Sequence, residues 1–65
     1  MREGERRSDI RSGMSVGVVL KEDQSTGYIT YGKVGRILTK SATHPHGIKV
    51  KLTTGEVGRV KEILK

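Results

Sequence analysis

A chain of 65 residues is long enough for one small domain with a limited core. It contains no cysteine, which excludes disulfides, thiolate metal sites and cysteine nucleophiles. No apolar run approaches the roughly 20 residues of a membrane helix, and the charged N-terminus lacks the apolar stretch of a secretory signal. We therefore expect a cytoplasmic protein with no membrane partner.

The charge is strongly positive, with 13 Lys and Arg against 7 Asp and Glu and a net charge of +6. Such a field attracts polyanions, of which RNA and DNA are the commonest in the cytosol. A surplus of lysine is equally typical of a protein that is merely soluble. Charge alone leaves these two interpretations open.

Residues 1–9 have no apolar periodicity and are predicted to form a flexible N-terminal arm, with a brief helical turn capped by Ser8 or Asp9. Residues 10–65 are predicted to form the folded domain, with Ile10 as its first core residue. Val and Ile dominate the apolar residues of this part, and the chain has nine glycines. This composition favours short strands and tight turns.

Four segments carry the period-two alternation of apolar residues that is typical of strands. They cover residues 15–21, 28–39, 48–52 and 56–60. Alternation predicts a shared core on one side of these strands. Its expected members are Val16, Val18, Leu20, Val34, Ile37, Ile48, Val50, Leu52, Val57 and Val60.

The apolar spacing changes from two to three at two places. Between Val34 and Ile37 the change predicts a bulge or sharp bend. After Val60 it predicts a helical turn over residues 61–63, with Leu64 closing the core. Residues 53–56 contain a glycine between two strands and predict a hairpin turn.

An all-β fold follows from these elements. Four to five short, bent strands with one apolar face are typical of a small SH3-like open barrel, because closure covers that face and protects the edges. An OB-fold is the second choice, although it usually needs a longer chain and a helix.

Two resemblances support the barrel. The segment Gly32-Lys33-Val34-Gly35-Arg36-Ile37-Leu38, followed by Ile48-Lys49-Val50-Lys51-Leu52, resembles the KOW motif of ribosomal proteins and NusG-type elongation factors. Lys21-Glu22-Asp23-Gln24 and Thr43-His44-Pro45-His46-Gly47-Ile48-Lys49-Val50 look like the YwbE family of small bacterial and archaeal proteins. The second resemblance covers nearly the whole chain. It implies an SH3-like, KOW-like fold and no established activity.

Basic residues on strands are the main candidate site. Alternation places five of them away from the core, where they could contact phosphates or protect strand edges. They are Lys33, Arg36, Lys49, Lys51 and Arg59. Tyr28 and Tyr31 could stack on unpaired bases beside them, although packing within the protein is the favoured interpretation. These tyrosines also depart from the basic or polar residues expected in relatives.

The tripeptide His44-Pro45-His46 offers two imidazoles. A zinc site needs at least three protein ligands, so we expect a rigid loop without a bound metal, or a contact to RNA. Glu22 and Asp23 are adjacent and point to different sides, which argues against paired acid–base chemistry. No phosphate-binding loop is present. We therefore expect no enzyme, no cofactor and no small-molecule substrate.

These features predict a non-enzymatic RNA-binding module. Binding would be driven by phosphates and weakly sequence-specific, in a setting associated with the ribosome or with transcription. The alternative is a protein–protein interaction module, because SH3-like barrels also bind proteins. One coherent basic face would favour nucleic acid, and an exposed apolar groove would favour protein.

Overall fold

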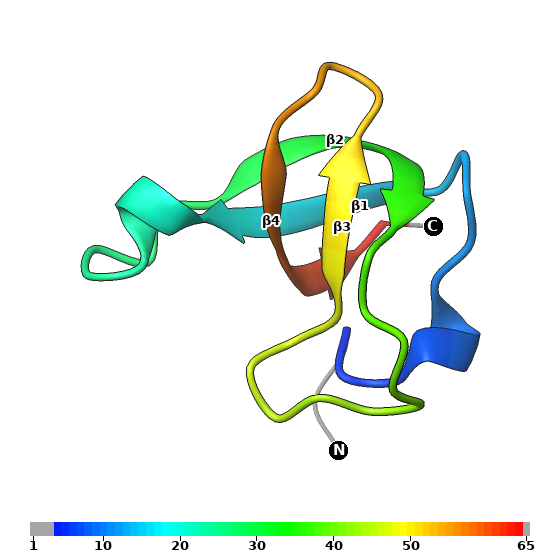
Figure 1. Ribbon diagram of the computed structural model, residues 1–65. Coiled ribbons are helices and arrows are strands. Elements are labelled where there is room, and N and C mark those ends of the chain that lie inside the picture. The colour runs from blue at the N-terminus through cyan, green and yellow to red at the C-terminus, as the bar shows by residue number, and fades with distance from the viewer. Residues whose placement is uncertain (1–3, 65) are drawn as a thin grey trace.

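Four antiparallel strands close into a barrel in the computed structural model, which describes residues 4–64 (Figure 1). The strands are β1 (Ser15–Leu20), β2 (Thr30–Ile37), β3 (Lys49–Leu52) and β4 (Val57–Ile63), and the 3₁₀ turns are η1 (Arg7–Asp9) and η2 (Lys21–Asp23). Each strand pairs with the next, and β1 also pairs with β4. The predicted all-β barrel is therefore confirmed, with four strands. The sheet is closed and not open as predicted, because β1 pairs with both β2 and β4. Among the described residues, no helix is long and apolar enough to cross a membrane.

Side chains that alternate toward the inside form one apolar core. Its buried members are Ile10, Val16, Val18, Leu20, Val34, Ile48, Val50, Leu52 and Val60. The docking of Ile10 and the alternation along β3 are thus confirmed, with Lys49 and Lys51 exposed. Ile37 packs against the cluster half-buried, whereas Val57 is half-buried and lies outside it.

A bulge in β2 lets the sheet bend. The register between β2 and β3 shifts between Val34 and Arg36, so the irregularity predicted from the apolar spacing is confirmed. Gly35 occupies the bulge, and a Cβ there would lie 3.1 Å from the carbonyl oxygen of Lys51. A larger residue at this position would therefore fit only if the neighbouring backbone of β3 gave way slightly.

The helical turn predicted over residues 61–63 is wrong, because β4 stays extended to Ile63. Val18 is opposite Val60 and Gly17 is opposite Glu62, so Lys61 is the extra residue of a bulge. A spacing of three between inward-facing residues thus arises from an insertion in an extended strand. The hydrogen bonds that β4 makes to β1 hold it extended.

The sequence predicted that Leu64 closes the core, but this side chain is 41% exposed. After the bulge the inward position falls on Ile63, which packs partly buried against the cluster. Leu64 contributes its backbone instead, since its N–H donates to the carbonyl of Ser15 at 2.9 Å. The hairpin turn over residues 53–56 is confirmed by a bond of 2.8 Å from the Leu52 N–H to the Glu56 carbonyl.

The segment 4–9, expected within a flexible arm, lies along the loop that precedes β3. Three backbone bonds attach it there: Ile48 N–H to Gly4 carbonyl at 2.8 Å, His44 N–H to Glu5 carbonyl at 2.9 Å, and Arg7 N–H to Ala42 carbonyl at 2.8 Å. Gly4 has a φ of +85°, and a Cβ on it would lie 2.5 Å from the carbonyl oxygen of Val60. Backbone pairing thus holds this segment without apolar periodicity. Residues 1–3 of the arm lie outside the described residues.

The N-terminal turn starts earlier than predicted. Ser8 and Asp9, expected as its cap, lie inside η1, and Arg6 occupies the N-cap position. Arg6 also forms an isolated bridge with Thr43. The pairing of the segment with the 42–48 loop therefore determines where the turn begins.

Candidate nucleic-acid interface

Cations from three strands lie in two rows across the outside of the barrel. Lys49 on β3 is directly opposite Arg59 on β4, and Lys51 on β3 is directly opposite Arg36 on β2. Because Val50 points inward, Lys49 and Lys51 share the outer face of β3. Four of the five predicted basic residues thus form one surface, which we call the basic track (Arg36, Lys49, Lys51 and Arg59).

The basic track works against the stability of the sheet. Directly opposed residues on antiparallel strands have Cβ atoms about 4.5–5.5 Å apart, and like charges at this spacing repel. Both cross-strand pairs of the track carry two positive charges. An anion bound over these pairs would relieve the repulsion.

Lys33 lies apart from the two rows. It is exposed on β2 and is opposite Ser15 of β1. Its carbonyl accepts a bond of 2.9 Å from the N–H of Thr53. The structure therefore brings Lys33 to the barrel surface without pairing it with another member of the predicted set.

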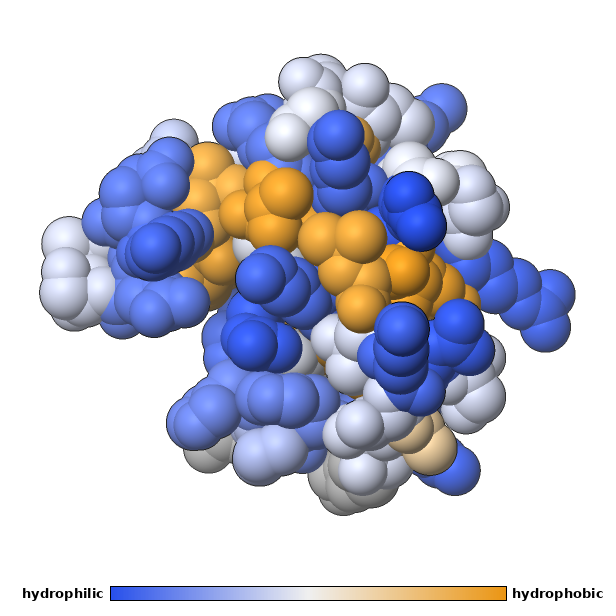
Figure 2. Space-filling view, viewed as in Figure 1, coloured by the Kyte–Doolittle hydropathy of each residue, from blue (hydrophilic) through white to orange (hydrophobic). Residues whose placement is uncertain are grey.

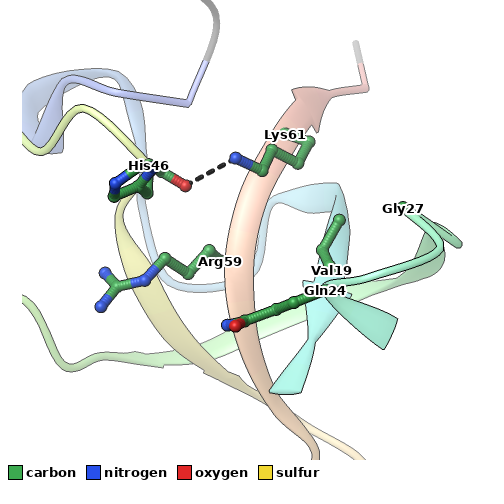
Figure 3. Close-up of a pocket in the computed structure, with 6 residues that line it drawn as sticks. All are labelled: Val19, Gln24, Gly27, His46, Arg59 and Lys61. Carbon is green, nitrogen blue, oxygen red and sulfur yellow. Dashed lines mark hydrogen bonds between the residues drawn. The ribbon is translucent and has the colours of Figure 1, made fainter. Parts of the chain in front are cut away.

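Two adjoining hollows lie beside the track, between the loop after β1, β4 and the loop before β3. The larger, of about 450 Å³, is lined by Val19, Gln24, Gly27, His46, Arg59 and Lys61 (Figure 3). The smaller, of about 330 Å³, is lined by Val19, Lys21, Gln24, Lys49, Val57, Gly58 and Arg59. Among residues 4–64, no Asp or Glu lines either hollow. Together they form what we call the basic groove.

Two cations of the basic groove are held by the loop that precedes β3. Arg59 Nη1 donates to the carbonyl of Gly47 at 3.1 Å, and Lys61 Nζ donates to the carbonyl of His46 at 2.7 Å (Figure 3). Gly47 has a φ of +99°, and a Cβ on it would collide with the carbonyl oxygen of Val60. This close approach orients both side chains and leaves their other N–H groups available to an anion.

The same loop is ordered by its histidines. The backbone N–H of His46 donates to Nδ1 of His44 at 3.1 Å, and the two ring centroids are 5.8 Å apart. Burial lowers the pKa of His44, and the positive charges of Arg59, His46 and Lys61 lower it further. The predicted loop is therefore bonded to the groove, and its imidazoles lie in a positive field.

The two tyrosines lie on the surface, so packing in the core is excluded for both. Tyr28 is 66% exposed and Tyr31 is 57% exposed. The Tyr31 hydroxyl donates to Oε2 of Glu62 at 2.9 Å, and this bond raises the pKa of Tyr31, with smaller contributions from burial and from the charge of Glu62. Its ring covers Gly17, where a Cβ would lie 2.9 Å from a ring carbon. Tyr31 is thus joined to a carboxylate and not to the basic track.

The described residues bring together too few ligand side chains for a metal site. Within residues 4–64, no group of three His, Cys, Asp or Glu side chains comes close enough together to hold an ion. Nδ1 of His44 already accepts a hydrogen bond from the backbone. The two imidazoles alone fall short of the three protein ligands that zinc sites use.

Sequence reasoning missed three polar residues of the basic groove: Lys21, Gln24 and Lys61. Lys61 fell within a predicted helical turn, and only its register with β1 reveals a bulge. Gln24 and Lys21 belong to a polar loop whose course depends on bonds of the Asp23 carbonyl to the N–H groups of Thr26 and Gly27, at 3.2 and 2.8 Å. The cluster of polar residues before Gly27 was the available signal for a tight turn.

Comparison with known proteins places the sequence among small proteins of one kind. The profile of a family described as "Uncharacterized conserved protein (DUF2196)" matches residues 3–63. The "Uncharacterized protein YwbE" of Bacillus subtilis is 52% identical over 61 residues, which is 94% of each chain. No solved structure matches the chain significantly.

Proposed function

The chain belongs to the YwbE (DUF2196) family, and we propose that it is a non-enzymatic module that binds single-stranded RNA. Binding would be driven by phosphate contacts and would depend little on base sequence. The phosphates would lie over the basic track and continue into the basic groove. Lys33, His44, His46 and the exposed tyrosines would add contacts outside the basic track.

The observation that carries the proposal is that two cross-strand pairs in the sheet each consist of two cations. Lys49 is directly opposite Arg59, and Arg36 is directly opposite Lys51. Local rules of sheet stability are most often broken at functional sites, where the gain appears on binding. A polyanion with regularly spaced charges matches rows of cations that continue from strand to strand.

Salt dependence tests the proposal. A labelled single-stranded RNA is titrated with the protein at several salt concentrations. Each phosphate contact adds a slope of about −0.7 to the plot of log K against log salt, because bound counterions are released. Replacing Lys49 and Lys51 together with Gln should flatten the slope by about 1 to 1.5 if both contact phosphates. Both side chains are exposed, so the fold should persist, with circular dichroism as the check.

A matched variant controls for net charge. Arg11→Gln with Lys40→Gln removes the same two charges from exposed positions outside the basic track and the basic groove. It should leave the slope nearly unchanged. Equal flattening by both variants would attribute the binding to diffuse charge. Absence of RNA binding by the wild-type protein at low salt would refute the proposal.

Protein–protein interaction is the second candidate. Figure 2 shows an apolar band that crosses the face carrying β3 and β4, between groups of hydrophilic side chains. Leu38 and Leu64 are also 36% and 41% exposed. A wild-type protein without RNA affinity would favour this alternative.

The proposal includes a cytoplasmic setting close to the ribosome or to transcription. The KOW-like pattern over residues 32–38 and 48–52 supports this setting, and the absence of cysteine agrees with a reducing compartment. Copurification with ribosomes or polymerase, compared with and without nuclease, tests it. Loss of every partner after nuclease treatment would show that RNA holds them.

A further inference from the structure

The larger hollow of the basic groove is larger than phosphate contacts require. Its lining also includes an apolar side chain and an amide, which phosphate contacts do not need. Its volume is about 450 Å³, within the range of sites that hold small molecules. Four parts of the chain surround it: strand β1, the loop after β1, strand β4 and the loop before β3 (Figure 3). A polyanion that only followed the basic track would leave this space empty.

One side chain of the lining is apolar and nearly buried. Val19 lies on the outer side of β1, in register with Arg59, yet it is only 7% exposed. It does not belong to the core cluster inside the barrel. An apolar side chain in the lining of a charged hollow adds nothing to phosphate binding, but it can pack against the flat face of a nucleobase.

One wall of the hollow carries a free amide. Gln24 is exposed, and among residues 4–64 its side chain has no hydrogen-bond partner. In Figure 3 this side chain extends from the loop after β1 toward β4. An amide offers both a donor and an acceptor, the combination that base edges present in single-stranded RNA.

The opposite wall carries the two oriented cations. Arg59 and Lys61 are bonded to the adjacent carbonyls of Gly47 and His46, so they lie at the same edge of the hollow. A guanidinium and an ammonium can both bind the phosphate attached to a base. The lining therefore matches one nucleotide, with its base inside and its phosphate at the rim.

From this arrangement we infer that the larger hollow is a subsite for a single unpaired nucleobase, packed on Val19 and hydrogen-bonded by Gln24, with the adjoining phosphate held by Arg59 and Lys61. The inference rests on the proposed function and deepens it. The basic track supplies affinity for the backbone, and the subsite makes the protein distinguish nucleic acid from other polyanions. Exposed Tyr28, which follows Gly27 of the lining, lies at the sequence position next to this subsite.

The test compares two oligomers of equal length and charge at one low salt concentration. One is oligouridylate, and the other is an abasic ribose-phosphate oligomer. We expect the wild-type protein to bind oligouridylate about fivefold or more tightly than the abasic oligomer, as for a base contact of ordinary strength. Gln24→Ala should reduce this gap by weakening the binding of oligouridylate, although the packing on Val19 persists. Ser25→Ala, a neighbouring exposed position that does not line the hollow, should keep the gap.

A second measurement locates the base without a variant. Uridine monophosphate at millimolar concentration should shift the backbone amide resonances of Val19, Gln24 and Gly27 in a ¹⁵N spectrum. Residues that line neither hollow, such as Lys33, should stay in place.

The outcomes separate this inference from the proposed function. Equal binding of both oligomers would refute the base subsite and leave phosphate binding by the basic track standing. A gap that Gln24→Ala does not reduce would also refute it, because the base would then be bound elsewhere. Binding of neither oligomer at low salt would refute both proposals.

Discussion

Removing the like charges from β3 should stabilise the fold while it weakens RNA binding. Lys49 and Lys51 are each directly opposite an arginine, on β4 and on β2. Cross-strand charge pairs are worth about 0.2–1 kcal/mol, and opposed like charges cost a similar amount. Relief of two such contacts in Lys49→Gln with Lys51→Gln is therefore worth roughly 0.4–2 kcal/mol.

Thermal unfolding at low salt measures this gain. A gain of about 1 kcal/mol raises the Tm of a domain of this size by roughly 4–8 °C. The repulsion acts between exposed charges, so added salt should screen it and reduce the difference between variant and wild type. Urea unfolding should give the same gain with an unchanged slope, because the exposed surface is nearly the same.

The control variant separates local from global repulsion. Arg11→Gln with Lys40→Gln lowers the net charge equally, but neither residue belongs to a cross-strand pair of the barrel. It should stabilise the fold less than the change in β3. If the β3 variant were no more stable than wild type at low salt, or if its gain did not shrink with salt, the argument from opposed charges would fail.

Three further predictions concern stability. Val50→Ala should lower the free energy of unfolding by roughly 2–3 kcal/mol through lost burial and a cavity, whereas half-buried Val57→Ala should cost less than about 1 kcal/mol; urea titration checks both. Gly47→Ala should destabilise the fold clearly more than Gly55→Ala. Both glycines have a φ of +99°, but only at Gly47 would the added Cβ collide with a carbonyl oxygen, that of Val60. Equal losses of Tm would contradict this. Because folding lowers the pKa of His44, the unfolded chain binds more protons as the pH falls below about 6.5. Stability should therefore fall with pH in that window, and His44→Asn should flatten the decline measured by Tm.

Much of the barrel can be predicted from local patterns of the sequence. Alternation along Ile48–Leu52 fixes which side chains of β3 point inward, because successive residues of any strand point to opposite faces. A glycine at position 35, where the apolar spacing changes, is enough to predict the bulge in β2. These features depend on residues within a few positions of one another, so the sequence displays them directly.

The segment 4–9 and the end of β4 illustrate where local patterns fail. The segment 4–9 is attached by backbone hydrogen bonds to the loop before β3. Such bonds do not require any periodic pattern of side chains, so the sequence does not reveal them. At the end of β4, a spacing of three apolar residues suits a helical turn as well as a bulged strand. Pairing with β1 decides between them, since it satisfies the backbone of β4 only when that backbone is extended.

The sequence by itself determined that the chain forms a small β-barrel, that its excess charge is positive, and that Lys49 and Lys51 point outward. Only the tertiary structure decided that these lysines are opposite arginines and that Val19, Gln24 and Lys61 line one hollow. Strand register and loop placement depend on hydrogen bonds between residues far apart in the chain. A register slip of one residue would send every side chain of a strand to the other face. The pattern within a single strand does not reveal which residue of the neighbouring strand lies opposite each of its own residues.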